Sequence, residues 1–202
     1  MLGVHKQSSN LAVQGELGRF PLLINQLTSA FKNWIRICNL PIDNIIKMSY
    51  IDTLLWSSEK RDSYSRNMYN ILKILDLDHI WKNQGLQSID IMEVLKSKYS
   101  QTWLSSVKSP TQKKLKHYSS YKDKFILEDY IRFVPLTQRR QLTKLRISAH
   151  SLKIETGRYT NIDRSSRLCE VCKCGNIEDE KHFLLFCIAY KDLRDSLFEQ
   201  IA

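Results

Sequence analysis

The stretch CEVCKCGNIEDEKHFLLFC occupies residues 169–187 and contains four of the five cysteines in the chain. Two residues separate Cys169 from Cys172, nine more precede His182, and another four precede Cys187. Three thiolates and one imidazole complete a tetrahedral shell around zinc and leave no open position for water. The spacing therefore predicts one structural Zn²⁺ bound by these four side chains.

Cys174 leaves the choice of ligands open. A pair formed by Cys172 and Cys174, with a single residue between them, would still leave a tolerable seven residues before His182. We favour Cys169 and Cys172, because one intervening residue makes it harder for two thiolates to face the same ion. Cys174 would then be a spare thiol beside the site. The remaining alternative is a cluster of buried cysteines without metal.

The composition of the chain favours helices. Of its 202 residues 43% are hydrophobic, and only 6 are glycine and 4 proline, so a packed core is expected and few chain breaks are available. Helical segments are predicted at about 22–38, 42–55, 63–75, 88–107, 112–122, 126–133, 136–150 and 189–201. The expected fold is mostly α: a multi-helix bundle with a small C-terminal zinc knuckle of the Cys-Cys-His-Cys type.

Two parts are expected along the chain. Residues 1–153 would form a basic helical domain, and residues 154–202 a linker, the zinc knuckle and a terminal helix. The segment 154–159 shows no helical periodicity, which favours a linker there. Two aromatic residues of the long 88–107 helix, Tyr99 and Trp103, are expected to belong to the core.

Positive charge is concentrated in one part of the sequence. The chain carries 31 basic and 21 acidic side chains, for a formal net charge of +10. Residues 96–160 hold 15 of the basic and 4 of the acidic ones, whereas residues 169–202 have a net charge of −3. Such a surplus attracts polyanions and favours RNA or DNA as the partner, with an anionic membrane surface as the weaker interpretation.

The basic region alternates cations with aromatic residues, so phosphate contacts and base stacking are both conceivable. On a predicted helix, Arg140 and Lys144 lie four residues apart and therefore share a face. The alternative is a core made of the aromatic residues, with the lysines on a solvated face. The predicted nucleic-acid-binding residues are Lys113, Lys114, Lys116, Arg139, Arg140, Lys144 and Arg146.

Motifs of common enzyme classes are absent from the sequence. It contains no Gly-x-Ser-x-Gly, no glycine-rich phosphate loop before Lys-Ser/Thr and no His-Glu-x-x-His. We therefore expect neither catalysis nor a small-molecule substrate. A run of about 18 apolar residues is also missing, so no segment is expected to span a bilayer, and a membrane is not among the favoured partners. Clustered cysteines without a secretory signal favour a nuclear or cytoplasmic protein.

Three segments, LRISAHSLKIETGR (145–158), LCEVC (168–172) and IEDEKHFLLFC (177–187), resemble the region that follows the polymerase domain in reverse transcriptases of non-LTR (LINE-type) retrotransposons. Residues 2–21 are similar to the segment where that region begins. The resemblance implies the same four metal ligands as the spacing does. It also implies that the knuckle helps to hold RNA and DNA.

The chain departs from that family in lacking the paired aspartates of the polymerase motif and any endonuclease motif. The resemblance therefore implies a carboxy-terminal fragment that keeps nucleic-acid binding and does not copy a template. Two alternatives remain. One is a protein-interaction module that docks on a polymerase domain, and the other is a transposon remnant without function.

Overall fold

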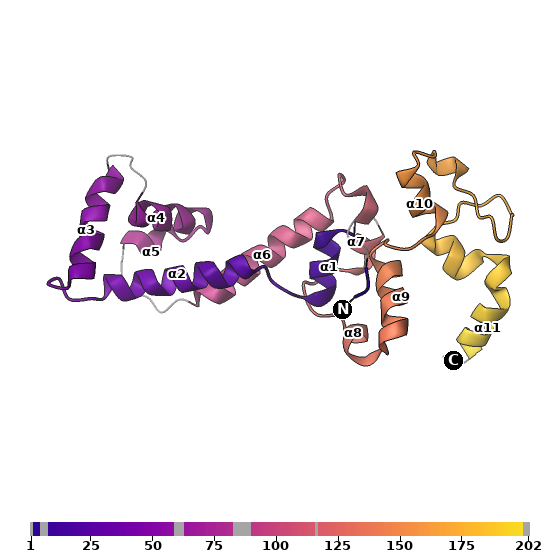
Figure 1. Ribbon diagram of the computed structural model, residues 1–202, viewed down its shortest axis with the longest axis horizontal. Helices are drawn as coiled ribbons and strands as arrows, with labels where there is room; N and C mark the ends of the chain where they lie inside the picture. Colours follow the sequence, from indigo (N-terminus) through magenta and orange to yellow (C-terminus); the bar gives the residue numbers. More distant parts are fainter. Residues whose placement is uncertain (1, 5–7, 59–62, 83–89, 116, 200–202) are drawn as a thin grey trace. The chain divides into compact units, whose positions relative to one another are not determined.

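The computed structural model describes residues 2–4, 8–58, 63–82, 90–115 and 117–199. Over these residues the chain is mostly helical and forms no β-strand, which confirms the predicted fold class (Figure 1). Within the same ranges, β-type pairing is limited to two isolated antiparallel bridges, Leu17–Leu127 and Leu168–Ile177. None of the described helices combines the length and the apolar character needed to span a bilayer.

The chain divides into two compact units, and the division differs from the predicted one. Unit 1 comprises Met1–Gly18 and Ser106–Ala202, and unit 2 comprises Arg19–Ser105. The predicted boundary after residue 153 therefore lies inside unit 1. The reason is that α1 (Asn10–Leu17) binds residues far along the chain: the Tyr118 hydroxyl donates to the Ala12 carbonyl oxygen, 3.3 Å away.

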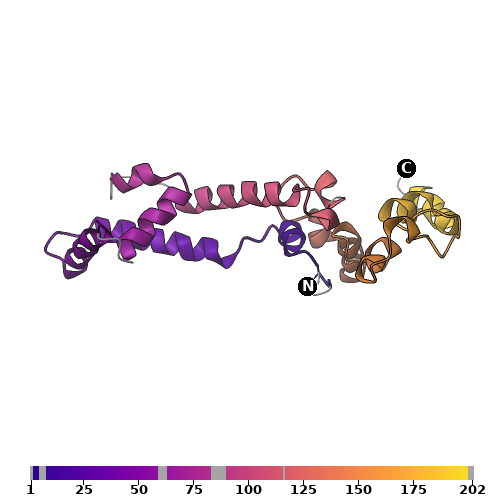
Figure 2. The same cartoon turned by 90° about the horizontal axis from the view of Figure 1, so that it is seen from above.

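Unit 2 is a helical bundle with an aromatic core. It contains α2 (Leu22–Cys38), α3 (Ile45–Ser58), α4 (Tyr64–Ile74), α5 (Asp78–Lys82) and most of α6 (Ile91–Val107), and α6 runs beside α2 in both views (Figures 1 and 2). The buried Trp34 stacks on Trp81 with centroids 5.6 Å apart, and its indole N–H donates to the Tyr50 hydroxyl at 2.9 Å. Trp103 is buried and Tyr99 packs against the core, as predicted.

The apolar side chains of α3 are more exposed than their helical spacing predicts. Tyr50 is buried at 4% exposure, but Ile45 is 80% and Leu55 65% exposed. The helix contacts α2 and α4, and these contacts bury Tyr50 and partly cover Leu54 while Ile45 and Leu55 stay exposed. A helical period predicts which residues share a face, whereas burial of that face depends on the presence of a partner.

Unit 1 consists of short elements. They are α1, η1 (Lys113–Leu115), α7 (Tyr118–Tyr121), α8 (Asp129–Phe133), α9 (Leu136–Arg146), α10 (Lys153–Tyr159), η2 (Arg164–Ser166), η3 (His182–Phe186), η4 (Ile188–Tyr190) and α11 (Lys191–Glu199). The predicted linker at 154–159 is wrong, because α10 occupies it. This helix is too short to show a period, and the Glu178 carboxylate accepts a hydrogen bond from the Lys153 backbone N–H at 2.9 Å.

A buried ion pair holds the first helix of unit 1 to α9. Glu16 has no exposed surface, and its two carboxylate oxygens accept hydrogen bonds from Nε and Nη2 of Arg146, at 2.8 and 3.1 Å. The same Nη2 donates to Glu128 at 2.8 Å, and the Tyr130 hydroxyl donates to Glu16 at 2.5 Å. Burial alone would lower the pKa of Arg146, but its bonds and attraction to Glu16 outweigh burial and raise it.

Gly18 ends α1 where no other residue would fit. Its φ of 54° is left-handed, and its backbone N–H closes the helix on the carbonyl oxygens of Gln14 and Gly15. A Cβ at this position would lie 2.3 Å from the backbone nitrogen of Leu127. The glycine therefore allows α1 to lie directly against the chain that leads into α8.

Candidate metal centre

The four predicted ligands come together in the structure. The ligand atoms of Cys169, Cys172, His182 and Cys187 all lie within 4.8 Å of one another. The sulfur atoms of Cys169 and Cys187 are 4.0 Å apart, and Cys172 Sγ is 3.3 Å from His182 Nε2. Tetrahedral zinc, with Zn–S bonds of about 2.3 Å, would hold two sulfur ligands about 3.8 Å apart. The group can therefore hold one metal ion.

A tight turn supplies the first two ligands. The Cys169 backbone N–H donates to the Asn176 carbonyl oxygen at 2.9 Å, and Lys173 N–H donates to the Cys169 carbonyl oxygen at 3.2 Å. Two residues of the turn are left-handed, Lys173 with φ 51° and Gly175 with φ 75°. The chain thus reverses just after Cys172, and both sulfur atoms face the same point.

A single wide helical turn supplies the other two ligands. The Asp179 carboxylate accepts a hydrogen bond from the His182 backbone N–H at 2.8 Å and so begins η3. Five residues later, Cys187 N–H donates to the His182 carbonyl oxygen at 2.7 Å. The helical turn η3 thus carries His182 at its first residue and ends just before Cys187. His182 and Cys187 are buried, at 5% and 0% exposure.

Cys174 lies beside the group and outside it. This exposed thiol is 2.9 Å from Cys172 Sγ, and it accepts a hydrogen bond from the Asn176 side-chain amide at 3.2 Å. The hydrogen bond with Cys174 raises the pKa of Cys172 to about 12, and the same bond lowers the pKa of Cys174. The geometry therefore agrees with the favoured pair, Cys169 and Cys172, and metal binding would have to displace the Cys172 proton.

Two acidic side chains attach the knuckle to the helices before it. The backbone carbonyl of Glu178 accepts a hydrogen bond from Ile154 N–H at 3.1 Å, in addition to the bond between its carboxylate and α10. Glu180, which is buried, accepts hydrogen bonds from the Ser148 hydroxyl at 3.0 Å and the His150 ring at 2.9 Å. Burial raises the pKa of Glu180, but these bonds outweigh it and lower the pKa to about 2.

The sequence interpretation missed these attachments. Of the acidic residues 178–180, Asp179 accepts the hydrogen bond from the His182 backbone N–H, whereas Glu178 and Glu180 bond to residues before the knuckle. The partners of these two lie about 25 to 32 residues away in the sequence, and no local pattern pairs residues over that distance. The metal centre is thereby connected to α10 and to the end of α9.

Alanine in place of Glu180 should loosen this attachment without removing the metal. We expect faster amide exchange in residues 147–153 and 178–182, because Ser148 and His150 lose a buried acceptor that contributes about 1–3 kcal/mol. Hydrogen–deuterium exchange with metal quantification measures both effects. Glu170→Ala is the matched control, because Glu170 forms an exposed ion pair with Lys153. Equal exchange in the two variants would contradict the assigned role of Glu180.

Two of the predicted nucleic-acid-binding residues are used inside the fold. Arg146 is bonded to Glu16 and Glu128 at the centre of unit 1. Arg139 is partly buried and donates to the Ile131 carbonyl oxygen, which ties α9 to α8. Their assignment as phosphate contacts is therefore corrected: both have charge suited to phosphate, but the tertiary structure occupies them with internal acceptors.

The other five predicted residues have different surroundings. Arg140 is exposed, and Lys144 is partly buried four residues later on α9. Lys114, also partly buried, lines the same hollow as Lys144. Lys116 lies outside the described residues, as does the side chain of Lys113. The structure thus keeps three of the predicted cations accessible, and we refer to Lys114, Arg140 and Lys144 as the basic rim.

No family model, curated protein or solved structure matches the chain. The metal centre and the basic rim are therefore interpreted from their own geometry. The resemblance to LINE-type reverse transcriptases stays a prediction made from the sequence.

Proposed function

We propose that unit 1 is a nucleic-acid-binding module, without catalytic activity, in which one zinc ion has a structural role. The observation that supports this most directly is the surplus of basic over acidic side chains in unit 1, three of whose carboxylates are also buried. Glu16, Glu155 and Glu180 are 0%, 3% and 8% exposed, while basic side chains of the same unit remain at the surface. Unit 1 carries 20 basic and 13 acidic side chains in all, and a positive surface attracts phosphates.

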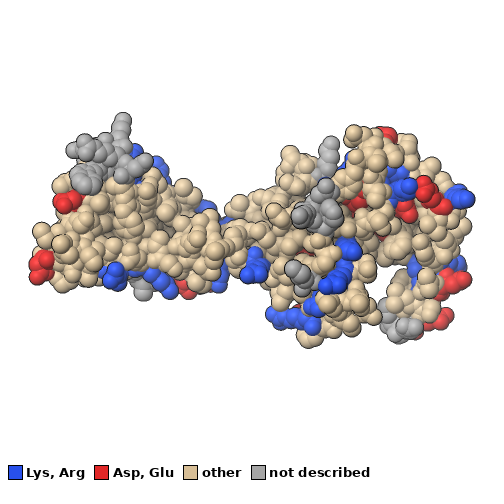
Figure 3. All heavy atoms as spheres, viewed as in Figure 1, with Lys and Arg blue, Asp and Glu red and all other residues tan. Residues whose placement is uncertain are grey.

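The basic rim would supply the phosphate contacts. Figure 3 shows lysine and arginine side chains gathered over the part of the chain that forms α8 and α9. The side chains of Arg140 and Lys144 form no hydrogen bond or ion pair with another described residue, so their charges are available to a ligand. They share a face of α9, as the sequence predicted.

This interface is smaller than the sequence predicted, because many cations of residues 96–160 pair within the protein. The pairing partners are carboxylates, backbone carbonyl oxygens or, for one lysine, an aromatic ring. The paired residues are Lys96, Lys98, Lys122, Arg139, Arg146, Lys153 and Arg158. Three phosphate contacts, from Lys114, Arg140 and Lys144, are therefore expected from the residues described.

The zinc ion would act through the knuckle. Three sulfur atoms and one imidazole nitrogen are the donor set of a closed structural zinc site. Zinc would fix the position of Glu178 and Glu180, and these two residues hold α10 and the end of α9. The segment 169–202 is net negative, so we assign the knuckle a bracing role and the phosphate contacts to the basic rim.

Salt dependence tests this proposal. Three phosphate contacts should make log affinity fall against log salt concentration with a slope of roughly −2 to −3. Arg140→Ala should reduce the magnitude of the slope by about 0.7–0.9 for any nucleic-acid sequence. Fluorescence anisotropy of a labelled oligonucleotide measures both. Lys32→Ala, at an exposed lysine on α2 of unit 2, is the control, and either a flat salt response or an equal effect in this control would contradict the proposal.

A second candidate function is docking on a polymerase domain, which the sequence resemblance also suggests. The exposed apolar side chains of α3 favour it, since Ile45 is 80% and Met48 54% exposed beside a groove of about 340 Å³. Under this function, Ile45→Glu should abolish co-purification with the polymerase domain of a LINE-type reverse transcriptase. Arg140→Ala should leave that association unchanged. Co-purification that survives Ile45→Glu would exclude docking through α3.

A further inference from the structure

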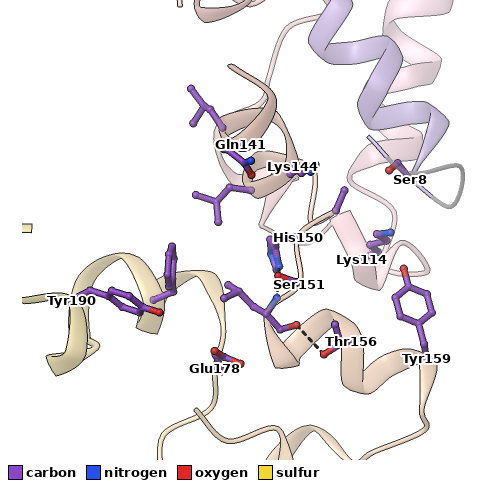
Figure 4. A pocket seen from close by; sticks show the side chains of 15 residues that line it. Ser8, Lys114, Gln141, Lys144, His150, Ser151, Thr156, Tyr159, Glu178 and Tyr190 are labelled. Carbon is purple, nitrogen blue, oxygen red and sulfur yellow. Dashed lines mark hydrogen bonds between the residues drawn. The ribbon is translucent and has the colours of Figure 1, made fainter. Parts of the chain in front are cut away.

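Unit 1 contains a hollow of about 860 Å³ between α9, residues 149–152, α10 and the knuckle (Figure 4). Small-molecule sites in proteins commonly measure roughly 300–1,000 Å³. In the close view, Tyr159 and Tyr190 lie at opposite ends of the hollow, with His150 and Ser151 between them. The hollow is thus elongated, and each end has an aromatic side chain.

The two aromatic ends differ in how they are held. The Tyr190 ring packs edge-on against Phe183, with centroids 5.1 Å apart, so its orientation is fixed by the knuckle. Tyr159 is the last residue of α10 and is 59% exposed. Its side chain forms no hydrogen bond or ring contact with another residue that the structure describes, so the faces of its ring can take up a planar ligand.

The polar groups of the hollow favour a ligand with negative charge and a polar edge. Lys114 and Lys144 contribute two positive charges, and Gln141 and Ser151 are exposed hydrogen-bonding side chains. Among the residues that line the hollow, one is acidic, Glu178, and its carboxylate already accepts a hydrogen bond from the Lys153 backbone N–H. The hollow therefore combines phosphate-binding cations with aromatic rings and with an amide and a hydroxyl that can pair with a base edge.

We infer that this hollow takes up an unpaired nucleobase, with adjacent phosphates on Lys114 and Lys144, so that unit 1 prefers single strands to duplexes. In a duplex both faces of each base are covered by its neighbours, and the base cannot stack on Tyr159 without leaving the helix. In a single strand the base reaches the ring freely. The inference rests on the proposed function and specifies the class of nucleic acid that the basic rim binds.

The test uses the full, zinc-loaded chain with two fluorescent probes, a single-stranded oligouridylate and a blunt-ended RNA duplex with the same number of phosphates. The wild-type chain should bind the single strand more tightly. Tyr159→Leu should weaken single-strand binding by about tenfold and leave duplex binding unchanged, because it removes the stacking surface and retains every charge. Tyr159→Phe should retain the wild-type affinity, since stacking needs only the ring.

Phe198→Leu is the matched control, because Phe198 is also a 53% exposed aromatic residue of unit 1 and does not line the hollow. Wild-type affinities for both probes are expected in this variant. The base-binding site would be overturned if the wild-type chain bound the two probes with equal affinity, or if Tyr159→Leu lowered the affinity for both probes equally. Either result would leave the proposed function standing. If the wild-type chain bound neither of the two probes at low salt, the proposed function itself would be overturned.

Discussion

Serine in place of Cys187 is expected to abolish binding of one equivalent of zinc and to unfold residues 164–190. The side chain of Cys187 is completely buried, and its sulfur atom lies among the other three ligand atoms. A serine hydroxyl is a poor zinc ligand at neutral pH, and zinc supplies on the order of 10–16 kcal/mol of gross binding free energy to small zinc folds. Few buried apolar residues remain in this segment to replace that contribution.

Native mass spectrometry measures the zinc stoichiometry, and hydrogen–deuterium exchange measures the unfolding. Cys174→Ser is the control, because Cys174 is exposed and outside the group of four. It should retain one equivalent of zinc and the exchange protection of the wild-type knuckle. Loss of zinc in Cys174→Ser, or its retention in Cys187→Ser, would show that the ligand set is wrong.

The second large effect is expected for Arg146→Ala, which should lower the unfolding free energy of unit 1 by about 3–5 kcal/mol. Removing one partner of a buried ion pair leaves the other charge without compensation. Here the remaining charge is Glu16, whose side chain has no contact with solvent and would keep tyrosine hydroxyls, among them that of Tyr130, as neutral partners. The variant also removes the arginine from above the rings of Tyr121 and Tyr130.

Denaturant-dependent hydrogen exchange resolved by peptide measures this loss for unit 1 separately from unit 2. Tryptophan fluorescence would not suffice, because all four tryptophans of the chain lie between residues 19 and 105, in unit 2. Arg140→Ala, at an exposed position of the same helix, should change the free energy by less than about 0.5 kcal/mol. Equal destabilisation in the two variants would contradict the role assigned to Arg146.

The metal centre was predictable because its ligands are close in the sequence. A turn brings Cys169 and Cys172 together, and one helical turn connects His182 to Cys187. Most helices were predictable for the same reason, since their hydrogen bonds join residues three or four positions apart. The distribution of glycine, proline and apolar residues therefore determines the helical class, and the spacing of the cysteines and His182 determines the four ligands.

Tertiary contacts decided the rest. Arg146 and Arg140 have the same kind of side chain on the same helix, yet one is buried against Glu16 and the other is exposed. Glu16 is 130 residues from Arg146 along the chain, so no spacing rule could pair them. The same holds for Glu178 and the start of α10, and for α1, which joins the later part of the chain and so moves the boundary between the units. Charge and periodicity describe what a segment can bind, and only the folded chain determines which partner is present.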